Sequence, residues 1–119
     1  MPGLQKINFQ GREIIYLDYR GQSEQQMIGH LKEAEKTILE DNKPYLTLTN
    51  ISDAFATKGF LKQAGVLGER TGHLTIKGAI VGLNGGKKVL LKVFNRLFVG
   101  KKGLQPFDTE KEALEYLVR

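Results

Sequence analysis

Hydrophobic and polar residues follow two different periods along this chain, and these periods divide it into strands and helices. Segments rich in β-branched and aromatic residues, bounded by glycine, asparagine or proline, predict strands. They cover residues 7–10, 13–19, 45–49 and 76–83. The apolar run at 79–81 is typical of a central strand of a parallel sheet. Pro106 restricts residues 104–107 to a short edge strand, because proline donates no hydrogen bond to a neighbouring strand.

Elsewhere the apolar residues recur every three or four positions, which predicts helices with one apolar face. The first helix begins at a capping box formed by Ser23 and Gln26. The second begins at a cap provided by Ser52 or Asp53 and ends near Gly68, before a polar loop. The residues that form the two apolar faces are Met27, Leu31, Ala34 and Ile38, and then Phe60, Leu61 and Ala64.

A third helix is expected at residues 87–98, and a fourth begins at a second capping box, formed by Thr109 and Glu112. The order of elements is therefore β-β-α-β-α-β-α-β-α. Strands that alternate with helices predict an α/β fold with a mixed, mainly parallel sheet. The first two strands form a hairpin around Gly11 and Arg12, which adds an antiparallel edge. Without a linker or a repeat, residues 1–119 are expected to form a single domain.

The composition limits the kinds of functional site that the chain can contain. The chain has 119 residues, of which 40% are hydrophobic and 26% charged, as is typical of one globular domain. The lack of cysteine excludes disulfides and thiolate metal sites, and two histidines leave little for other metals. We therefore expect no metal and no cofactor. Because no apolar run is long enough for a signal peptide or a membrane span, we expect a cytoplasmic protein.

Residues typical of catalysis are sparse. His30 lies in the middle of the first helix, and His73 lies in a loop without an adjacent acid or nucleophile. Neither histidine has the oriented partner that a catalytic histidine needs. The acidic residues Glu33, Glu35 and Glu40 lie on a solvated helix. The sequence therefore favours a protein that is not an enzyme.

A glycine-rich turn with two lysines follows the fourth strand. Gly85 and Gly86 precede Lys87 and Lys88 at the start of the third helix, where backbone amides can bind an anion. The phosphate-loop pattern fails, because Val81 replaces its first glycine and Lys88 replaces the hydroxyl residue that holds magnesium. Two interpretations stay open: a weak anion site, or a turn that only lets the strand enter the helix.

The junction between the third strand and the second helix is the other candidate site. In a parallel sheet, binding surfaces form at the carboxyl ends of the strands. The helix dipole and Lys58 would favour a phosphate beside the hydroxyl groups of Ser52 and Thr57. The alternative is that Ser52 or Asp53 only caps the helix. The candidate residues of this junction are Asn50, Ser52, Asp53, Thr57, Lys58 and Gly59.

The net charge of +5 combines two unlike parts of the chain. Residues 57–104 contain ten basic residues and one acidic residue, whereas the rest contains eight basic and twelve acidic residues. On the third helix, Lys88, Lys92 and Arg96 form a basic stripe opposite its apolar face. Such a stripe would meet phosphates, acidic lipids or an acidic partner, and the alternative is a solvated face. Nucleic acid is less favoured as a partner, because no aromatic residue is interleaved among these basic residues.

Three segments, together with the order of elements, resemble one known family. The segments are residues 77–83 (KGAIVGL), 87–92 (KKVLLK) and 106–114 (PFDTEKEAL). They are similar to the SpoIIAA-like branch of STAS domains, the sulphate-transporter and anti-sigma-factor-antagonist fold, which is related to CRAL-TRIO lipid-transfer domains. The resemblance runs through nearly the whole chain. It implies a sheet of four or five strands with helices largely on one face, and a domain without catalytic activity.

The resemblance also carries an expectation for the second helix. In the bacterial anti-sigma antagonists, a serine in an Asp-Ser-Ser-Gly-type motif at the start of this helix is phosphorylated, which switches binding to a partner kinase. The matching stretch here is Ala56, Thr57, Lys58 and Gly59. Ala56 replaces the aspartate and Lys58 stands at the acceptor position, so no intact phosphoacceptor motif is expected. If a hydroxyl serves instead, Thr57 is favoured over Ser52.

We therefore expect a non-enzymatic, STAS-like regulatory module of bacterial type that binds a protein partner through the junction at residues 50–59. One alternative is a carrier of a small apolar or anionic, lipid-like ligand. Another is a peripheral protein that binds a membrane or an acidic partner through its basic third helix. A nucleic-acid-binding protein and an unrecognised enzyme are further alternatives. Phe98 and Val99 either form a homodimer patch or belong to the core.

Overall fold

The computed structural model describes residues 3–55, 57–83 and 104–119. Its strands are β1 (Gly3–Phe9), β2 (Arg12–Asp18), β3 (Tyr45–Asn50), β4 (Thr75–Val81) and β5 (Gln105–Phe107). Its helices are α1 (Glu24–Asp41), α2 (Lys58–Thr71), the short 3-10 helix η1 (Gly72–Leu74) and α4 (Glu110–Leu117). The third helix expected at residues 87–98 lies outside the described residues.

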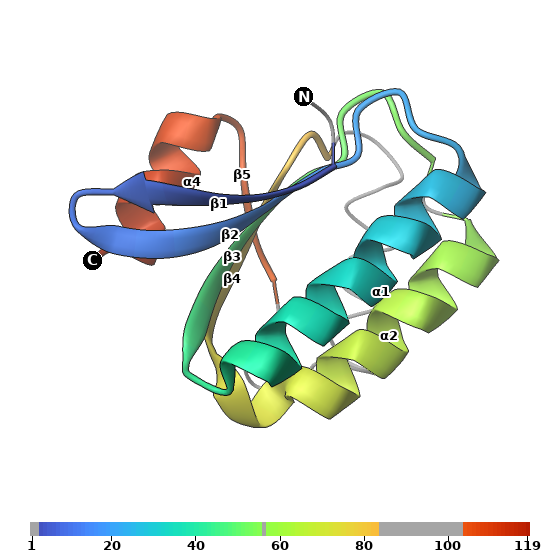
Figure 1. Cartoon of the computed structure of the whole chain (residues 1–119). Helices are drawn as coiled ribbons and strands as arrows, with labels where there is room; N and C mark the ends of the chain where they lie inside the picture. The colour runs from blue at the N-terminus through green and yellow to red at the C-terminus, as the bar shows by residue number, and fades with distance from the viewer. Residues whose placement is uncertain (1–2, 56, 84–103) are drawn as a thin grey trace.

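The five strands form one sheet, in which they lie side by side in their order along the chain (Figure 1). β1 pairs antiparallel with β2, whereas β2, β3, β4 and β5 are mutually parallel. The predicted α/β class and the mixed, mainly parallel sheet are therefore confirmed. β5 lies at the edge of the sheet with Pro106 opposite Ile80, as expected for a strand that contains proline.

The hairpin between β1 and β2 turns at Gln10 and Gly11, whose φ angles are +52° and +80°. Phe9 and Arg12 are register partners, so the connection has two residues and suits the right-handed twist of the strands. Arg12, expected in the turn, is the first residue of β2. β1 begins well before the predicted start at residue 7, because its strand conformation follows from pairing with β2 rather than from β-branched residues of its own.

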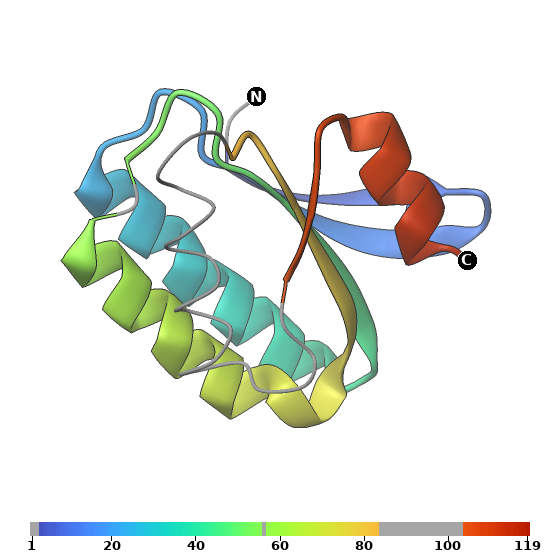
Figure 2. The ribbon, with the colours of Figure 1, turned by 180° about the vertical axis from the view of Figure 1, so that it is seen from behind.

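Helices lie on both faces of the sheet, as Figures 1 and 2 show from two sides. Alternate residues of β2 pack into cores on opposite faces. Ile15 and Leu17 belong to a core that also contains residues of α1 and α2. Ile14 and Leu48 belong to a second core, which contains Ala113 and Leu117 of α4. Of the described helices, α1 and α2 cover one face and α4 covers the other. This arrangement agrees with the expectation that helices lie largely on one face.

The predicted capping residues are found at two helix starts. The Ser23 hydroxyl accepts from the N–H of Gln26, and the Gln26 side chain accepts from the N–H of Ser23, so the capping box is complete. The Thr109 hydroxyl accepts from the N–H of Glu112 at 3.2 Å, but the Glu112 carboxylate accepts from this hydroxyl instead of the N–H of Thr109, so only the cap of the second predicted box is formed. All four residues predicted to form the apolar face of α1 are buried: Met27, Leu31, Ala34 and Ile38. The capping residues and the spacing of the apolar residues are therefore enough to predict these helix starts from the sequence.

The start of α2 differs from the prediction. Its N-cap is Thr57, whose hydroxyl accepts from the N–H of Phe60 at 3.2 Å, and neither Ser52 nor Asp53 caps it. Asn50 Oδ1 accepts from the N–H of Ser52 at 3.0 Å, and Asp53 has φ of +54°, so these residues form a turn instead. The turn is held on the core, because Ile51 before it and Ala54 after it are buried.

The end of α2 also differs from the prediction. The helix continues past Gly68 to Thr71, so most of the polar loop expected at residues 69–75 is helical. Thr71 is fully buried and therefore belongs to the core rather than to an exposed loop. β4 then ends at Val81, because Gly82 turns the chain with φ of +91°.

Candidate functional site

The carboxyl ends of β2, β3 and β4 lie side by side, and the connections that leave them form the candidate site. The N–H of Tyr19 donates to the Asn50 carbonyl at 2.9 Å, and the N–H of Ile51 donates to the Val81 carbonyl at 3.0 Å. The connections after β2 and β3 then run together towards α1 and α2 (Figure 1). We call this region the carboxyl edge.

A cleft of about 620 Å³ opens at the carboxyl edge. Its walls come from the connections after β3 and β4 and from the end of β5. The lining residues include Ser52, Asp53, Phe55, Gly82, Phe107 and Asp108. The volume lies in the range of ordinary ligand pockets. The Phe55 side chain is 82% exposed, although its neighbour Ala54 is buried. The cleft therefore combines an exposed aromatic ring with two carboxylates.

Gly82 allows the connections after β3 and β4 to approach each other at this cleft. A Cβ atom at position 82 would lie 2.4 Å from the backbone nitrogen of Ser52. The φ angle of +91° also favours glycine over other residues. The close approach of the two connections therefore depends on the missing side chain.

A half-buried polar cluster joins the carboxyl edge to α4. The Tyr16 hydroxyl donates to the Glu110 carboxylate, and Asn50 Nδ2 donates to Glu110 Oε2 at 3.0 Å. Burial, together with the hydrogen bond to Glu110, raises the pKa of Tyr16 to about 12. Tyr16 therefore keeps its proton at neutral pH and acts as a donor, not as a base. Asn50, a predicted site residue, connects the Ser52 turn to α4, because its side-chain Oδ1 accepts from Ser52 and its Nδ2 donates to Glu110.

A buried carboxylate at this edge is paired with arginine. Asp18 is 1% exposed, and its two oxygens accept from Nε and Nη2 of Arg20 at 2.9 and 2.7 Å. These hydrogen bonds hold the pKa of Asp18 below its usual range. Gln22 donates to the Asp18 carbonyl and lies 2.9 Å from Nδ1 of His30. This geometry orients His30 towards an amide rather than towards an acid or a nucleophile.

The other predicted junction residues lie at the start of α2, next to α1. Thr57 Oγ1 donates to Oε1 of Glu24 at 2.5 Å, while Lys58 and Gly59 are exposed residues. The structure thus separates the predicted junction into two groups. Asn50, Ser52 and Asp53 belong to the cleft and the polar cluster, whereas Thr57, Lys58 and Gly59 form the first turn of α2 with its cap.

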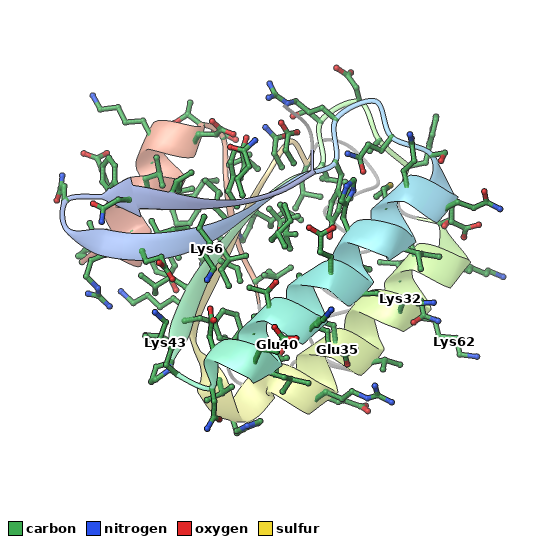
Figure 3. All side chains as sticks on the ribbon, viewed as in Figure 1. Lys6, Lys32, Glu35, Glu40, Lys43 and Lys62 are labelled. Carbon is green, nitrogen blue, oxygen red and sulfur yellow. The ribbon has the colours of Figure 1, made fainter. Side chains whose placement is uncertain are left out.

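The predicted anion or acidic-partner site lies outside the described residues. It comprises Gly85, Gly86, Lys87, Lys88, Lys92 and Arg96. Among the described basic residues, Arg70 on α2 pairs with Glu35 on α1 at 3.2 Å. Figure 3 shows Lys32 and Glu35 along α1 and Lys62 on the neighbouring α2. The described outer surface of these helices therefore carries mixed charge, as a solvated face does.

Several contacts at and beside the carboxyl edge do not follow from the sequence pattern. Tyr16 and Glu110 are 94 positions apart, and Thr57 and Glu24 are 33 positions apart, so no local pattern connects them. The exposure of Phe55 could have been suspected from the sequence, because Phe55 is an aromatic residue in a turn next to an expected helix start. The ion pair of Asp18 and Arg20 could have been suspected as well, since two opposite charges follow an apolar strand at positions i and i+2.

Two further findings concern the described part of the chain alone. In residues 3–55, 57–83 and 104–119, no group of three or more histidine, aspartate or glutamate side chains is placed to hold a metal ion. In the same ranges, no helix has both the length and the apolar character needed to cross a bilayer.

The arrangement of strands and helices is similar to that of a solved protein. An anti-sigma-factor antagonist (STAS) domain protein from Planctomyces limnophilus superposes with a TM-score of 0.59, over 98% of this chain and 99% of that chain. The chain has the fold of a STAS domain. The two sequences are 12% identical, so the likeness to the STAS domain concerns the fold and confirms the resemblance at that level. No protein-family model matches the sequence, and a search of curated proteins finds no match.

Proposed function

We propose that this protein is a non-enzymatic regulatory module that binds a protein partner at the carboxyl edge. The observation that carries the proposal is Phe55, which is 82% exposed at the rim of the cleft. Exposed aromatic residues beside a concave surface are enriched in protein interfaces, where a few such side chains provide most of the binding energy. The STAS fold supports the proposal as well, because domains of this fold generally bind proteins.

The charge of the cleft favours one kind of partner segment. Asp53 and Asp108 line the cleft together with Phe55 and Phe107. A segment that carries a basic side chain next to an apolar one complements both features, because opposite charge steers the encounter and apolar contact holds the complex.

The paired polar groups at the carboxyl edge support a role without catalysis. Glu110 accepts from Tyr16 and Asn50, and Asp18 is paired with Arg20. A general acid or base has to exchange a proton with a substrate, whereas these groups satisfy one another. Their role in this proposal is to hold the connections and α4 in place around the cleft.

The state of Thr57 supports partner binding that does not depend on a phosphorylated serine. Its hydroxyl accepts from Phe60 and donates to Glu24, so both of its hydrogen-bonding functions are used. Lys58 stands at the acceptor position of the motif that the sequence resembles. The proposal is therefore a module whose partner contact depends on the shape of the cleft.

The alternatives from the sequence gain less support. A lipid carrier needs an apolar interior, whereas the cleft at the carboxyl edge is lined by Asp53 and Asp108 as well as by apolar groups. The basic stripe and the residues Phe98 and Val99, on which the membrane and homodimer hypotheses rest, lie outside the described residues.

The proposal is tested by comparing Phe55→Ala with Leu39→Ala. Leu39 on α1 is another exposed large apolar residue, at 42%, and lies away from the cleft lining. Tagged wild type and both variants are used to capture proteins from a lysate of the source organism, and each enriched protein is purified and titrated. We expect a partner whose Kd rises roughly tenfold or more with Phe55→Ala and stays unchanged with Leu39→Ala.

Circular dichroism establishes first that both variants are folded. Equal Kd values for the wild type and Phe55→Ala, for every protein that binds, would contradict the proposal.

A further inference from the structure

The two outer strands of the sheet differ in how they are protected. An outer strand carries unpaired backbone groups that another strand can join, and proteins protect it by proline, by a bulge or by keeping it short. β5 has three residues and includes Pro106. β1 has seven residues without proline, and its register with β2 is unbroken from Gly3 to Phe9. β1, which runs along the other side of the sheet in Figure 1, therefore has none of these three forms of protection.

The outward backbone groups of β1 belong to alternate residues. Phe9 and Arg12 flank a two-residue turn and therefore form a hydrogen-bonded pair, and such pairs alternate along an antiparallel ladder. As a result, the backbone N–H and C=O groups of Leu4, Lys6 and Asn8 point away from β2. Among the described residues, no strand lies on that outer side of β1.

Lysine on an outer strand normally discourages pairing with another chain, but the charge of Lys6 is already compensated. Its Nζ lies 2.7 Å from Oδ2 of Asp41, the last residue of α1. The other six residues of β1 are uncharged. A strand that joins β1 therefore meets a single lysine that has its own counter-ion.

We propose that β1 pairs antiparallel with β1 of a second copy of this chain, which joins two sheets in a symmetric dimer. The side chains favour a register centred on Ile7. The two Ile7 side chains then meet on the face where Ile7 packs against the core that contains α4 residues. Lys6 of each copy lies opposite Asn8 of the other, and these residues exchange their outward hydrogen bonds. A register centred on Lys6 would instead place two lysines directly opposite each other, which is unfavourable.

The difference between β1 and β5 limits the assembly to two copies. A two-fold contact uses β1 of both copies and leaves β5 of each copy at the outside of the joined sheet. The short β5 contains a proline, which donates no hydrogen bond, so the joined sheet is protected at both ends. The pairing therefore closes as a dimer and does not continue into a fibre.

The consequence for partner binding rests on the proposed function. The described residues that line the cleft come from outside β1, so the pairing does not use them. A dimer carries two clefts and would bind a partner that has two matching segments more tightly than a monomer does. The pairing itself is independent of any partner.

Sedimentation equilibrium over a range of protein concentrations measures the pairing. We expect the average mass to rise from 13.3 kDa towards twice this value as the concentration increases. Asn8→Lys is the decisive variant, because position 8 faces Glu13 within its own chain but Lys6 of the other copy in the dimer. The new lysine therefore suits the folded monomer and repels the second copy. We expect the Kd of the dimer to rise roughly tenfold with this variant.

Asn8→Gln is the matched control. Both variants lose the Asn8 side chain, whose Oδ1 accepts from the N–H of Gly11, but only Asn8→Lys adds charge. We expect the Kd of Asn8→Gln to equal that of the wild type. Circular dichroism establishes that both variants are folded.

Amide hydrogen exchange followed by NMR locates the contact. Exchange at the N–H groups of Lys6 and Asn8 should slow as the protein concentration rises, because these groups become hydrogen-bonded only in the dimer. The N–H of Ile7 is bonded to β2 and should exchange slowly at every concentration.

A mass of 13.3 kDa at all concentrations would overturn the proposal. So would a dimer with equal Kd values for Asn8→Lys and Asn8→Gln, or one in which exchange at Lys6 and Asn8 does not change. None of these results affects the Phe55 experiment, because Phe55 lies outside β1. Conversely, a failure to find a partner through Phe55 would leave the pairing of β1 standing.

Discussion

The amino and carboxyl ends of the parallel strands differ in how their polar groups are used. At the amino end, hydroxyl groups satisfy one another. Thr75 Oγ1 lies 2.7 Å from the Tyr45 hydroxyl, which lies 2.9 Å from Thr71 Oγ1, and Thr71 donates to the Leu67 carbonyl at 2.7 Å. This chain of hydrogen bonds ties the starts of β3 and β4 to the end of α2, where Thr71 is fully buried.

At the carboxyl end, the polar groups are charged or are placed by unusual backbone. Asp18 and Glu110 are held by arginine, tyrosine and asparagine side chains, and Asp53 and Gly82 have positive φ. These contacts support a surface that stays open around Phe55. The comparison teaches that this sheet has one end built for stability and another built to present a cleft, and each can be altered separately.

Gly82→Ala should have the largest effect. The new methyl group would lie 2.4 Å from the backbone of Ser52 in a conformation that disfavours alanine, so we expect the unfolding free energy to fall by roughly 2–4 kcal/mol. Gly72, at the amino end, has helical φ and open space for a Cβ atom, so Gly72→Ala should change stability by less than about 1 kcal/mol. Urea unfolding measures both. Equal losses would show that the carboxyl edge does not depend on the close approach at Gly82.

Thr71→Val should have an intermediate effect. It keeps the volume of the side chain but removes the acceptor of Tyr45 and the donor to Leu67. We expect a loss of roughly 1–3 kcal/mol, because partly buried polar groups would be left unpaired. Chemical denaturation against the wild type measures the loss. A neutral result would mean that water replaces the hydroxyl, and that the amino end is less closed than its contacts indicate.

Tyr19→Phe should have the smallest effect. Tyr19 follows β2 at the carboxyl end and is fully buried, packed edge-on against Phe60 with ring centroids 5.3 Å apart. Its hydroxyl has no hydrogen-bond partner within the described part of the chain. Removing it should leave the unfolding free energy unchanged or raise it by up to about 1 kcal/mol. A thermal melt that shows a loss comparable to that of Thr71→Val would reveal a partner for this hydroxyl and would weaken the contrast between the two ends.

The sequence predicted those features whose causes are local. The capping box at Ser23 and the apolar period of α1 lie within a few residues of each other, and both are found as expected. The start of α2 was predicted wrongly, because buried Ile51 and Ala54 hold the preceding turn on the core. This tertiary contact outweighs the capping preference of Ser52 and Asp53, which a local pattern alone would favour.

The candidate site was predicted less completely than the fold. The junction after β3 was predicted on general grounds, because binding surfaces form at the carboxyl ends of parallel strands, and the structure places a cleft beside it. Its partners were not predicted, since Glu110 reaches Asn50 from α4, 60 positions away, and Glu24 reaches Thr57 from α1. Such pairs follow from the topology of the sheet and become visible only once the helices are packed on it.

The placement of α4 has a consequence for how the chain is made. All five strands precede α4 in the chain, yet Ile14 of β2 and Leu46 of β3 are covered by the core that α4 completes. About 100 residues separate Ile14 from the end of α4. A ribosome adds about 5–20 residues per second, so α4 is complete roughly 5–20 s after Ile14 has been added to the chain. Until α4 is made, the apolar side chains that it covers lack this cover, so a chaperone can bind them.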